Sequence, residues 1–125
     1  MALLANSGIM FDTAALPASG TLASSILQTN DRALIGIDIY VANASATSQG
    51  TLAVQVCNDI SGTPNWVPIT FSDTTTYLTI TSGDDVRAFA DLFGTAAKYI
   101  RLLWTTSSGT GGTIKAVATS KMGGM

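Results

Sequence analysis

The chain of 125 residues contains no histidine, no glutamate and a single cysteine. The absence of histidine removes the side chain that most often serves as a general base near neutral pH, and it rules out a Ser-His-Asp triad. Because Cys57 is alone, no disulfide can form within the chain. These absences predict a protein that is not an enzyme, with no catalytic residue, cofactor or metal ligand to assign.

Charge is also scarce. Charged residues make up 11% of the chain, less than half of the roughly 25% that is usual in globular proteins. The formal net charge of −2 leaves no basic surface for phosphate groups, so nucleic acid is not an expected partner. A surface with so little charge is either covered in an assembly or is the neutral, threonine-rich surface of an ordinary β-protein, and composition leaves both open.

Long apolar runs are missing as well. No run approaches the roughly 18 apolar residues of a membrane span. The start, MALLANSGIMF, has neither a basic segment nor an apolar stretch of signal-peptide length. We therefore expect a soluble protein made in the cytosol, with no membrane partner. The length suits one domain, which can bury roughly 65–70% of its unfolded surface without disulfides or metals.

What the chain does contain is alternation of apolar and polar residues. Serine and threonine make up about a quarter of it and surround short runs that predict strands. Strands are predicted over residues 21–28, 33–42, 51–57, 66–71, 75–81, 98–105 and 113–119. In 33–42, the clearest run, the isoleucines at every second position face one way. Pro68 cannot donate to a ladder, so its strand lies at an edge or a bulge. Residues 86–93 fit a short helix as well as a loop.

Seven or eight short strands without a long helix predict an all-β fold, a single-domain antiparallel β-sandwich that is jelly-roll-like. The sandwich is expected over residues 20–120 and a flexible tail over 121–125. Residues 1–19 form either an N-terminal arm that packs on a neighbouring subunit or a first strand of the sandwich. As an arm, the segment would contact its partner through Leu3, Leu4, Ile9, Met10 and Phe11, and its deletion would leave the domain folded.

Few groups remain for chemistry. Cys57 ends a strand with no cation nearby, which predicts a small structural residue rather than a reactive thiol. The eight acids are all aspartates, mostly in turns, where they accept local hydrogen bonds. Only Asp84, Asp85 and Asp91 form a local group, and they lack the spacing of an EF-hand. The glycine-rich stretch 109–115 lacks the Gly-Lys-Ser/Thr of a phosphate loop and predicts a hairpin turn.

Aromatic side chains are the remaining candidates for ligand binding. Tyr40, Trp66 and Tyr77 are the possible exposed aromatics, and such rings stack on sugars or bases. Tyr40 is the best of them, since it lies opposite the isoleucine face of its strand. Trp104 follows apolar residues on one face of its strand, which favours a place in the core.

Two stretches carry a resemblance to known proteins. Residues 54–59 (VQVCND) leading to 65–69 (NWVPI) resemble the V-x-V-S-N-D-G…W strand-turn-strand of many β-sandwich modules, and 98–102 (KYIRL) resembles the R-Y-V-R-L strand near their end. Discoidin-like carbohydrate-binding modules carry this pair. Small structural proteins of tailed bacteriophages carry it too, including head decoration (cement) proteins and tail components. Because paired cysteines and a signal peptide are missing, the phage resemblance fits better.

The phage resemblance implies a non-enzymatic virion protein, made in the host cytoplasm, on the outer capsid surface. Such proteins sit as symmetric homo-oligomers, here a dimer or trimer, and clamp adjacent subunits of the major capsid protein. The resemblance supplies no catalytic residue. Two alternatives use the same fold: a carbohydrate-binding module, and a tail, neck or fibre structural subunit.

Overall fold

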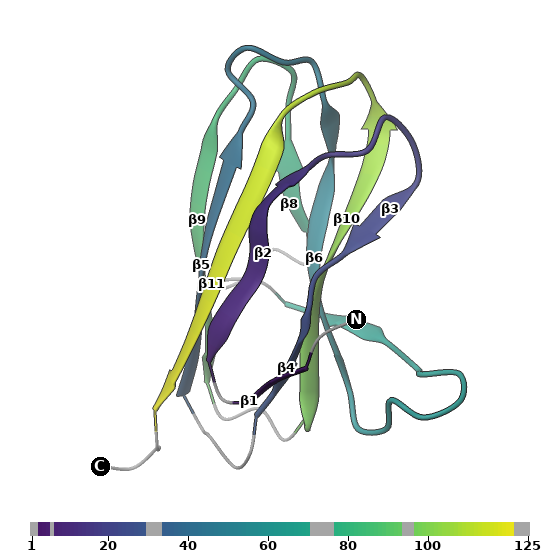
Figure 1. The fold of residues 1–125 in the computed structure, drawn as a ribbon, viewed down its shortest axis with the longest axis vertical. Helices are drawn as coiled ribbons and strands as arrows, with labels where there is room; N and C mark the ends of the chain where they lie inside the picture. Colours follow the sequence, from purple (N-terminus) through teal and green to yellow (C-terminus); the bar gives the residue numbers. More distant parts are fainter. Residues whose placement is uncertain (1–2, 6, 30–33, 71–76, 94–96, 122–125) are drawn as a thin grey trace.

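A computed structural model describes residues 3–5, 7–29, 34–70, 77–93 and 97–121 (Figure 1). Parts of the expected strands and tail, at 33, 71, 75–76 and 122–125, lie outside the described residues. The strands are β1 (Leu3–Ala5), β2 (Gly8–Ala15), β3 (Thr21–Ala23), β4 (Ile26–Gln28), β5 (Leu34–Ala42), β6 (Gln49–Cys57), β7 (Val67–Ile69), β8 (Tyr77–Ile80), β9 (Val86–Phe93), β10 (Tyr99–Ser108) and β11 (Thr113–Lys121). Nowhere in the described ranges is there a helix able to cross a membrane.

The strands form two sheets that pack face to face (Figure 1). The first, called the β6 sheet, has the order β1-β4-β10-β6-β7, with β3 paired to β10 and β8 paired to β6; the second, the β5 sheet, has the order β2-β11-β5-β9. The chain crosses between the two sheets at most connections. The predicted all-β sandwich is confirmed, and the pairing is antiparallel except between β1 and β4, which run parallel.

The core between the sheets holds the predicted inward faces. The isoleucines of β5 and the side chain of Trp104 are buried, and with them the apolar residues of β6 and β10 that alternate along each strand. The strand of Pro68 is the outermost of its sheet, paired on β6, as a residue without an N–H donor requires. Alternation with a period of two therefore located the buried faces correctly.

The segment 109–112 is not a hairpin, so that prediction is wrong. β10 and β11 belong to different sheets, and the turn carries the chain from one to the other. Gly109 has a φ of 80°, which L side chains rarely adopt. A Cβ there would lie 1.9 Å from the carbonyl oxygen of Thr47, so the close approach of the two loops requires glycine. Alternating runs on both sides of a turn do not show whether they pair with each other.

The ambiguous residues 86–93 form strand β9, neither a helix nor a loop. β9 pairs with β5 along its whole length, with Asp38 opposite Phe89. Phe89 faces solvent and is 55% exposed, and its ring lies over Gly36, where a Cβ would come within 2.5 Å of a ring carbon. A large apolar residue on the outer face hid the alternation that marks a strand.

The N-terminal segment is built into the sandwich. β2 pairs with β11 at the edge of the β5 sheet, and β1 pairs with β4 in the β6 sheet. Met10 and Phe11 are buried in the chain's own core, so the expectation that they contact a partner is corrected. Leu4 is half-buried, whereas Leu3 and Ile9 are each 48% exposed. The strand pairing places one side of this segment in the core and leaves the other side at the surface.

Candidate functional site

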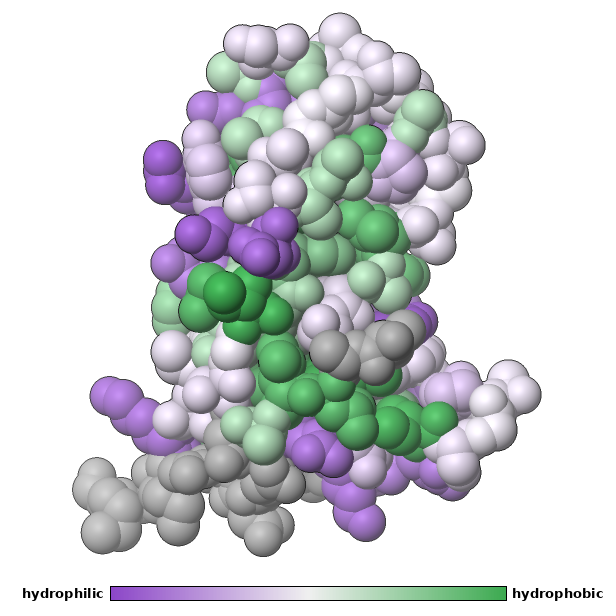
Figure 2. Space-filling model, viewed as in Figure 1, coloured by the Kyte–Doolittle hydropathy of each residue, from purple (hydrophilic) through white to green (hydrophobic). Residues whose placement is uncertain are grey.

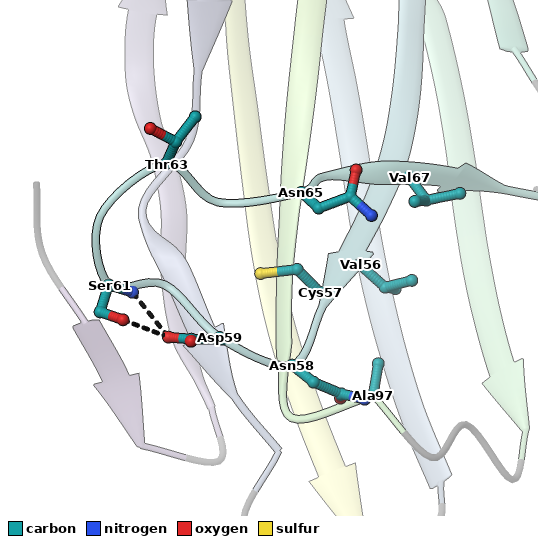
Figure 3. Close-up of a pocket in the computed structure, with 9 residues that line it drawn as sticks. All are labelled: Val56, Cys57, Asn58, Asp59, Ser61, Thr63, Asn65, Val67 and Ala97. Carbon is teal, nitrogen blue, oxygen red and sulfur yellow. Dashed lines mark hydrogen bonds between the residues drawn. The ribbon is translucent and has the colours of Figure 1, made fainter.

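The loop of residues 58–66, between β6 and β7, projects from the β6 sheet (Figure 1). Asn58 Oδ1 accepts a hydrogen bond from the Lys98 amide at 3.0 Å. Asp59 Oδ1 accepts two from Ser61, from the amide at 2.9 Å and from the hydroxyl at 2.6 Å (Figure 3). These bonds, the hydroxyl's most of all, lower the pKa of Asp59. The loop's polar groups thus hold its own conformation.

The loop lines one side of an open surface pocket of about 630 Å³ that includes Cys57. Figure 3 shows the thiol of Cys57 pointing into the interior of the loop. A reactive thiolate needs a cationic neighbour. No lysine or arginine lines this pocket, but Arg101 on the neighbouring strand β10 lies close enough for its charge to interact with Cys57, which corrects the expectation that no cation is nearby. Cys57 is buried at the end of β6.

A second pocket forms where Trp66, at the end of the loop, meets Arg101 of β10. The guanidinium carbon lies 4.4 Å from the centroid of the Trp66 ring. Arg101 Nε donates a hydrogen bond to Gln55 Oε1 at 2.8 Å, and Gln55 is the residue opposite Arg101 on β6. Burial of the guanidinium lowers the pKa of Arg101 from its ordinary value, although an arginine stays protonated at any pH of interest.

This second pocket, called here the Trp66 pocket, has a volume of about 500 Å³. It is lined by Leu3, Ile26, Ile60, Gly62, Pro64, Trp66 and Arg101. Leu3 stands opposite Ile26 because β1 and β4 pair in parallel. In Figure 2, apolar side chains gather on the lower half of the visible face, around β1 and the strands beside it.

The Trp66 pocket brings together two residues for which the sequence predicts separate roles. Leu3 was a candidate partner contact and Trp66 a candidate exposed aromatic, and both line the same pocket. Sequence reasoning missed Arg101 in this role. Alternation along its strand places Arg101 on the outer face, but only the path of the loop shows that Trp66 stacks on it.

Tyr40 and Tyr77 lie apart from this pocket. Tyr40 is half-buried on the β5 sheet, with the Arg87 guanidinium 4.0 Å from its ring centroid. Its hydroxyl donates to Asp85 Oδ2 at 3.3 Å. Tyr40 is therefore engaged on its ring and at its hydroxyl, which corrects the expectation of a free aromatic platform. Tyr77 of β8 is 48% exposed and stands opposite Ala53.

The aspartates that are close in sequence serve separate turns. Asp85 Oδ1 accepts hydrogen bonds from the amides of Asn43, at 2.7 Å, and Ala44, at 2.8 Å. Asp84 Oδ2 accepts one from the Thr81 hydroxyl at 2.6 Å. Across the described ranges, no group of three acidic, histidine or cysteine side chains is placed to hold a metal ion.

We expect Asp85→Asn to lower the melting temperature at neutral pH, and the loss to shrink as the pH falls below the ordinary carboxyl value of 3.8. The two amides, that of Asn43 first, depress the pKa of Asp85. The carboxylate therefore stabilises the fold above its unfolded pKa, and this stabilisation is lost as the pH falls through the lower folded pKa. Thermal unfolding from pH 2 to 7 tests this, with the exposed Asp12→Asn as control. A loss that is independent of pH would contradict it.

No protein-family model matches the chain, and no curated protein matches it. Similar solved structures include the SPBc2 prophage-derived protein YomS, 12% identical over 92% of this chain and 95% of that one, with a TM-score of 0.47. The CBM22-1 xylan-binding domain of Paenibacillus barcinonensis Xyn10C is 11% identical over 93% and 83%, with a TM-score of 0.49. The Tobacco streak virus coat protein dimer is 13% identical over 96% and 89%, with a TM-score of 0.46. At these values the likenesses carry no argument about what this chain does.

Proposed function

We propose that the chain is a non-enzymatic structural protein of a phage virion, which decorates and stabilises the capsid by binding the lattice of the major capsid protein. The observation that carries the proposal is the apolar surface at the Trp66 pocket, where Leu3 is exposed beside apolar neighbours. Exposed apolar patches on a soluble domain mark interaction sites. The same proposal places the protein on the outer capsid surface.

Three further features support decoration by surface burial. The strand motifs of residues 54–69 and 98–102 resemble those of phage structural proteins, and charge is scarce over the whole chain. In the described part of the chain, no metal-ligating group is assembled. A homo-oligomer on a symmetric lattice would repeat one weak contact several times, and such repetition raises avidity without any new kind of contact.

Co-sedimentation with particles of the source phage that lack this protein tests the proposal. We expect saturable binding at a stoichiometry that matches the lattice symmetry. We expect Leu3→Ser to weaken each contact about three- to tenfold, since full burial of a leucine side chain contributes roughly 1.5–3 kcal/mol and about half of Leu3 is exposed in the free protein. The matched control is Phe89→Ser, which removes an apolar side chain of similar exposure, 55% against 48%, from the other sheet.

The outcomes separate the parts of this proposal. If the folded wild-type protein does not bind particles, capsid decoration is wrong. If Leu3→Ser and Phe89→Ser bind equally well, the decorating surface does not include the Trp66 pocket. Binding to isolated tails but not to heads would favour a tail, neck or fibre subunit.

The second candidate function is carbohydrate binding, supported by the aromatic rings on the β6 sheet. Tyr77 is exposed and Trp66 lines a pocket on this sheet, and aromatic rings with a polar neighbour suit sugar faces. A glycan array with wild type and Tyr77→Ala tests it. Binding of a neutral glycan, lost on removal of the ring and without any binding to particles, would favour this function over decoration.

A further inference from the structure

The Trp66 pocket combines apolar walls with one half-buried cation. Arg101 uses its Nε to donate to Gln55. Among the described residues, no hydrogen bond from its two terminal amino groups is found and no carboxylate acts on its charge; the acidic group that does so is the Cys57 thiol. A guanidinium presents parallel N–H donors that match the two oxygens of a carboxylate. The pocket therefore contains an anion-binding fork that the chain itself does not use.

The geometry holds this fork in one orientation. The Trp66 ring stacks against the guanidinium, and Gln55 fixes its inner edge. A donor group that is already ordered loses little freedom when a ligand binds. Burial also lowers the pKa of Arg101, because the charge is partly desolvated, and a carboxylate at the pocket would offset that desolvation.

The other stacked arginine of the chain provides a contrast. Arg87 stacks on Tyr40 at 4.0 Å, and its charge acts on Asp85 of the same surface, whose pKa it helps to lower. Arg87 thus has a carboxylate neighbour in its own chain. Arg101 stacks on an aromatic ring in a similar way, but its neighbours are apolar residues and the Cys57 thiol, with no carboxylate.

We propose that the Trp66 pocket binds an apolar side chain together with an adjacent carboxylate of a partner polypeptide. The apolar group packs on Leu3, Ile26 and Trp66, and the carboxylate binds the terminal amino groups of Arg101. The volume of about 500 Å³ lies within the range of roughly 300–1,000 Å³ that is usual for ligand pockets. That the partner is the major capsid protein rests on the proposed function. The chemistry of the ligand that the pocket binds is inferred from the pocket residues alone.

Charge complementarity favours this occupant over a neutral sugar. A sugar hydroxyl accepts a hydrogen bond from a guanidinium but leaves its positive charge uncompensated beside apolar walls. A carboxylate supplies both acceptors and the opposite charge, and charge-assisted bidentate bonds are about twice as strong as neutral ones. The affinity of the pocket should therefore depend on the charge of the ligand.

Two small probes that differ only in charge test the site: phenylpropionate, and phenylpropionamide as its neutral analogue. Two-dimensional NMR spectra follow the indole N–H signals of Trp66 and Trp104. Trp104 is fully buried and donates its indole hydrogen to Thr106 at 2.8 Å, so it serves as an internal reference. We expect phenylpropionate to shift the Trp66 signal saturably. We expect the amide to bind at least about tenfold more weakly, a difference in binding free energy of about 1.4 kcal/mol or more.

Variants of the two stacked arginines complete the test. Arg101→Gln is expected to abolish the preference for the acid over the amide, and Arg101→Lys, which keeps the charge but loses the fork, to reduce it. Arg87→Gln, the matched control, should leave it unchanged. Equal binding of acid and amide, no saturable shift of Trp66, or a shift by cellohexaose but not by phenylpropionate would each overturn the proposal.

The probe result and the particle result are independent. Acid-selective binding by a protein that does not co-sediment with particles would support the proposed ligand of the Trp66 pocket and refute capsid decoration. Co-sedimentation by a protein without acid-selective binding would sustain decoration and refute the chemistry assigned to this pocket.

Discussion

Deletion of residues 1–19 is expected to unfold the protein. β2 forms an outer strand of the β5 sheet and pairs with β11. Without β2, the backbone N–H and C=O groups of β11 that pair with it would be exposed to water. The core side chains that pack on Met10 and Phe11 would be exposed as well. Far-UV circular dichroism and thermal unfolding of the truncated chain measure this. A truncated chain with a cooperative transition close to that of the full chain would contradict the strand pairing and restore the arm hypothesis.

A pair of point variants makes the same test without removing backbone. Phe11→Ala should lower the free energy of unfolding by about 3–5 kcal/mol, the usual range for a buried phenylalanine. Leu3→Ala should change it far less, by about 0.5–1 kcal/mol, because about half of the Leu3 side chain is already exposed. Urea denaturation gives both values. Comparable small losses in both variants would show that Phe11 is not in the core.

Trp104→Ala is expected to destabilise the protein by about 3–5 kcal/mol, a large part of the roughly 5–15 kcal/mol of a typical domain. The ring is fully buried. Its Nε1 donates to Thr106 Oγ1 at 2.8 Å, and that hydroxyl donates to the Pro17 carbonyl at 2.8 Å. The two bonds tie β10 to the segment that follows β2. Chemical denaturation monitored by circular dichroism measures the loss.

Thr106→Val separates the hydrogen bonds from the packing. It leaves the Trp104 indole and the Pro17 carbonyl without their partner, so a loss of about 1–3 kcal/mol is expected. The core volume is nearly unchanged by this substitution. A neutral Thr106→Val together with a Trp104→Ala loss below about 1 kcal/mol would contradict the described core.

The faces of single strands could be predicted from the sequence, whereas the partners of those strands could not. The isoleucines of β5 alternate without interruption, so their burial was predictable. β9 was missed because Phe89 places a large apolar ring on the solvent side. The sequence predicts a hairpin at 109–112, and the prediction is wrong because local alternation contains no information about which sheet a strand joins.

The same limit applies to the Trp66 pocket. Its residues come from β1, β4, β10 and the loop 58–66, and their meeting depends on the parallel pairing of β1 with β4. Residue type was enough to select Leu3 and Trp66. It was not enough to select Arg101, because an arginine on an outer face is an ordinary surface residue until its stacking partner and its lack of a nearby carboxylate are known.

The N-terminal segment connects stability to the proposed function. Along β2, Met10 and Phe11 are buried while Ile9 is exposed, and Leu3 of β1 reaches the Trp66 pocket. One short segment thus closes the sandwich with one set of side chains and offers apolar surface with another. Substitutions of the exposed set should change binding and leave the fold intact.

The most direct test of the central claim is amide hydrogen exchange of the protein bound to phage particles, compared with the free protein. We expect slower exchange on the particle in the loop 58–66 and in β1, with exchange in β9 on the opposite sheet unchanged. Protection of β9, with the loop exchanging as fast as in the free protein, would contradict it.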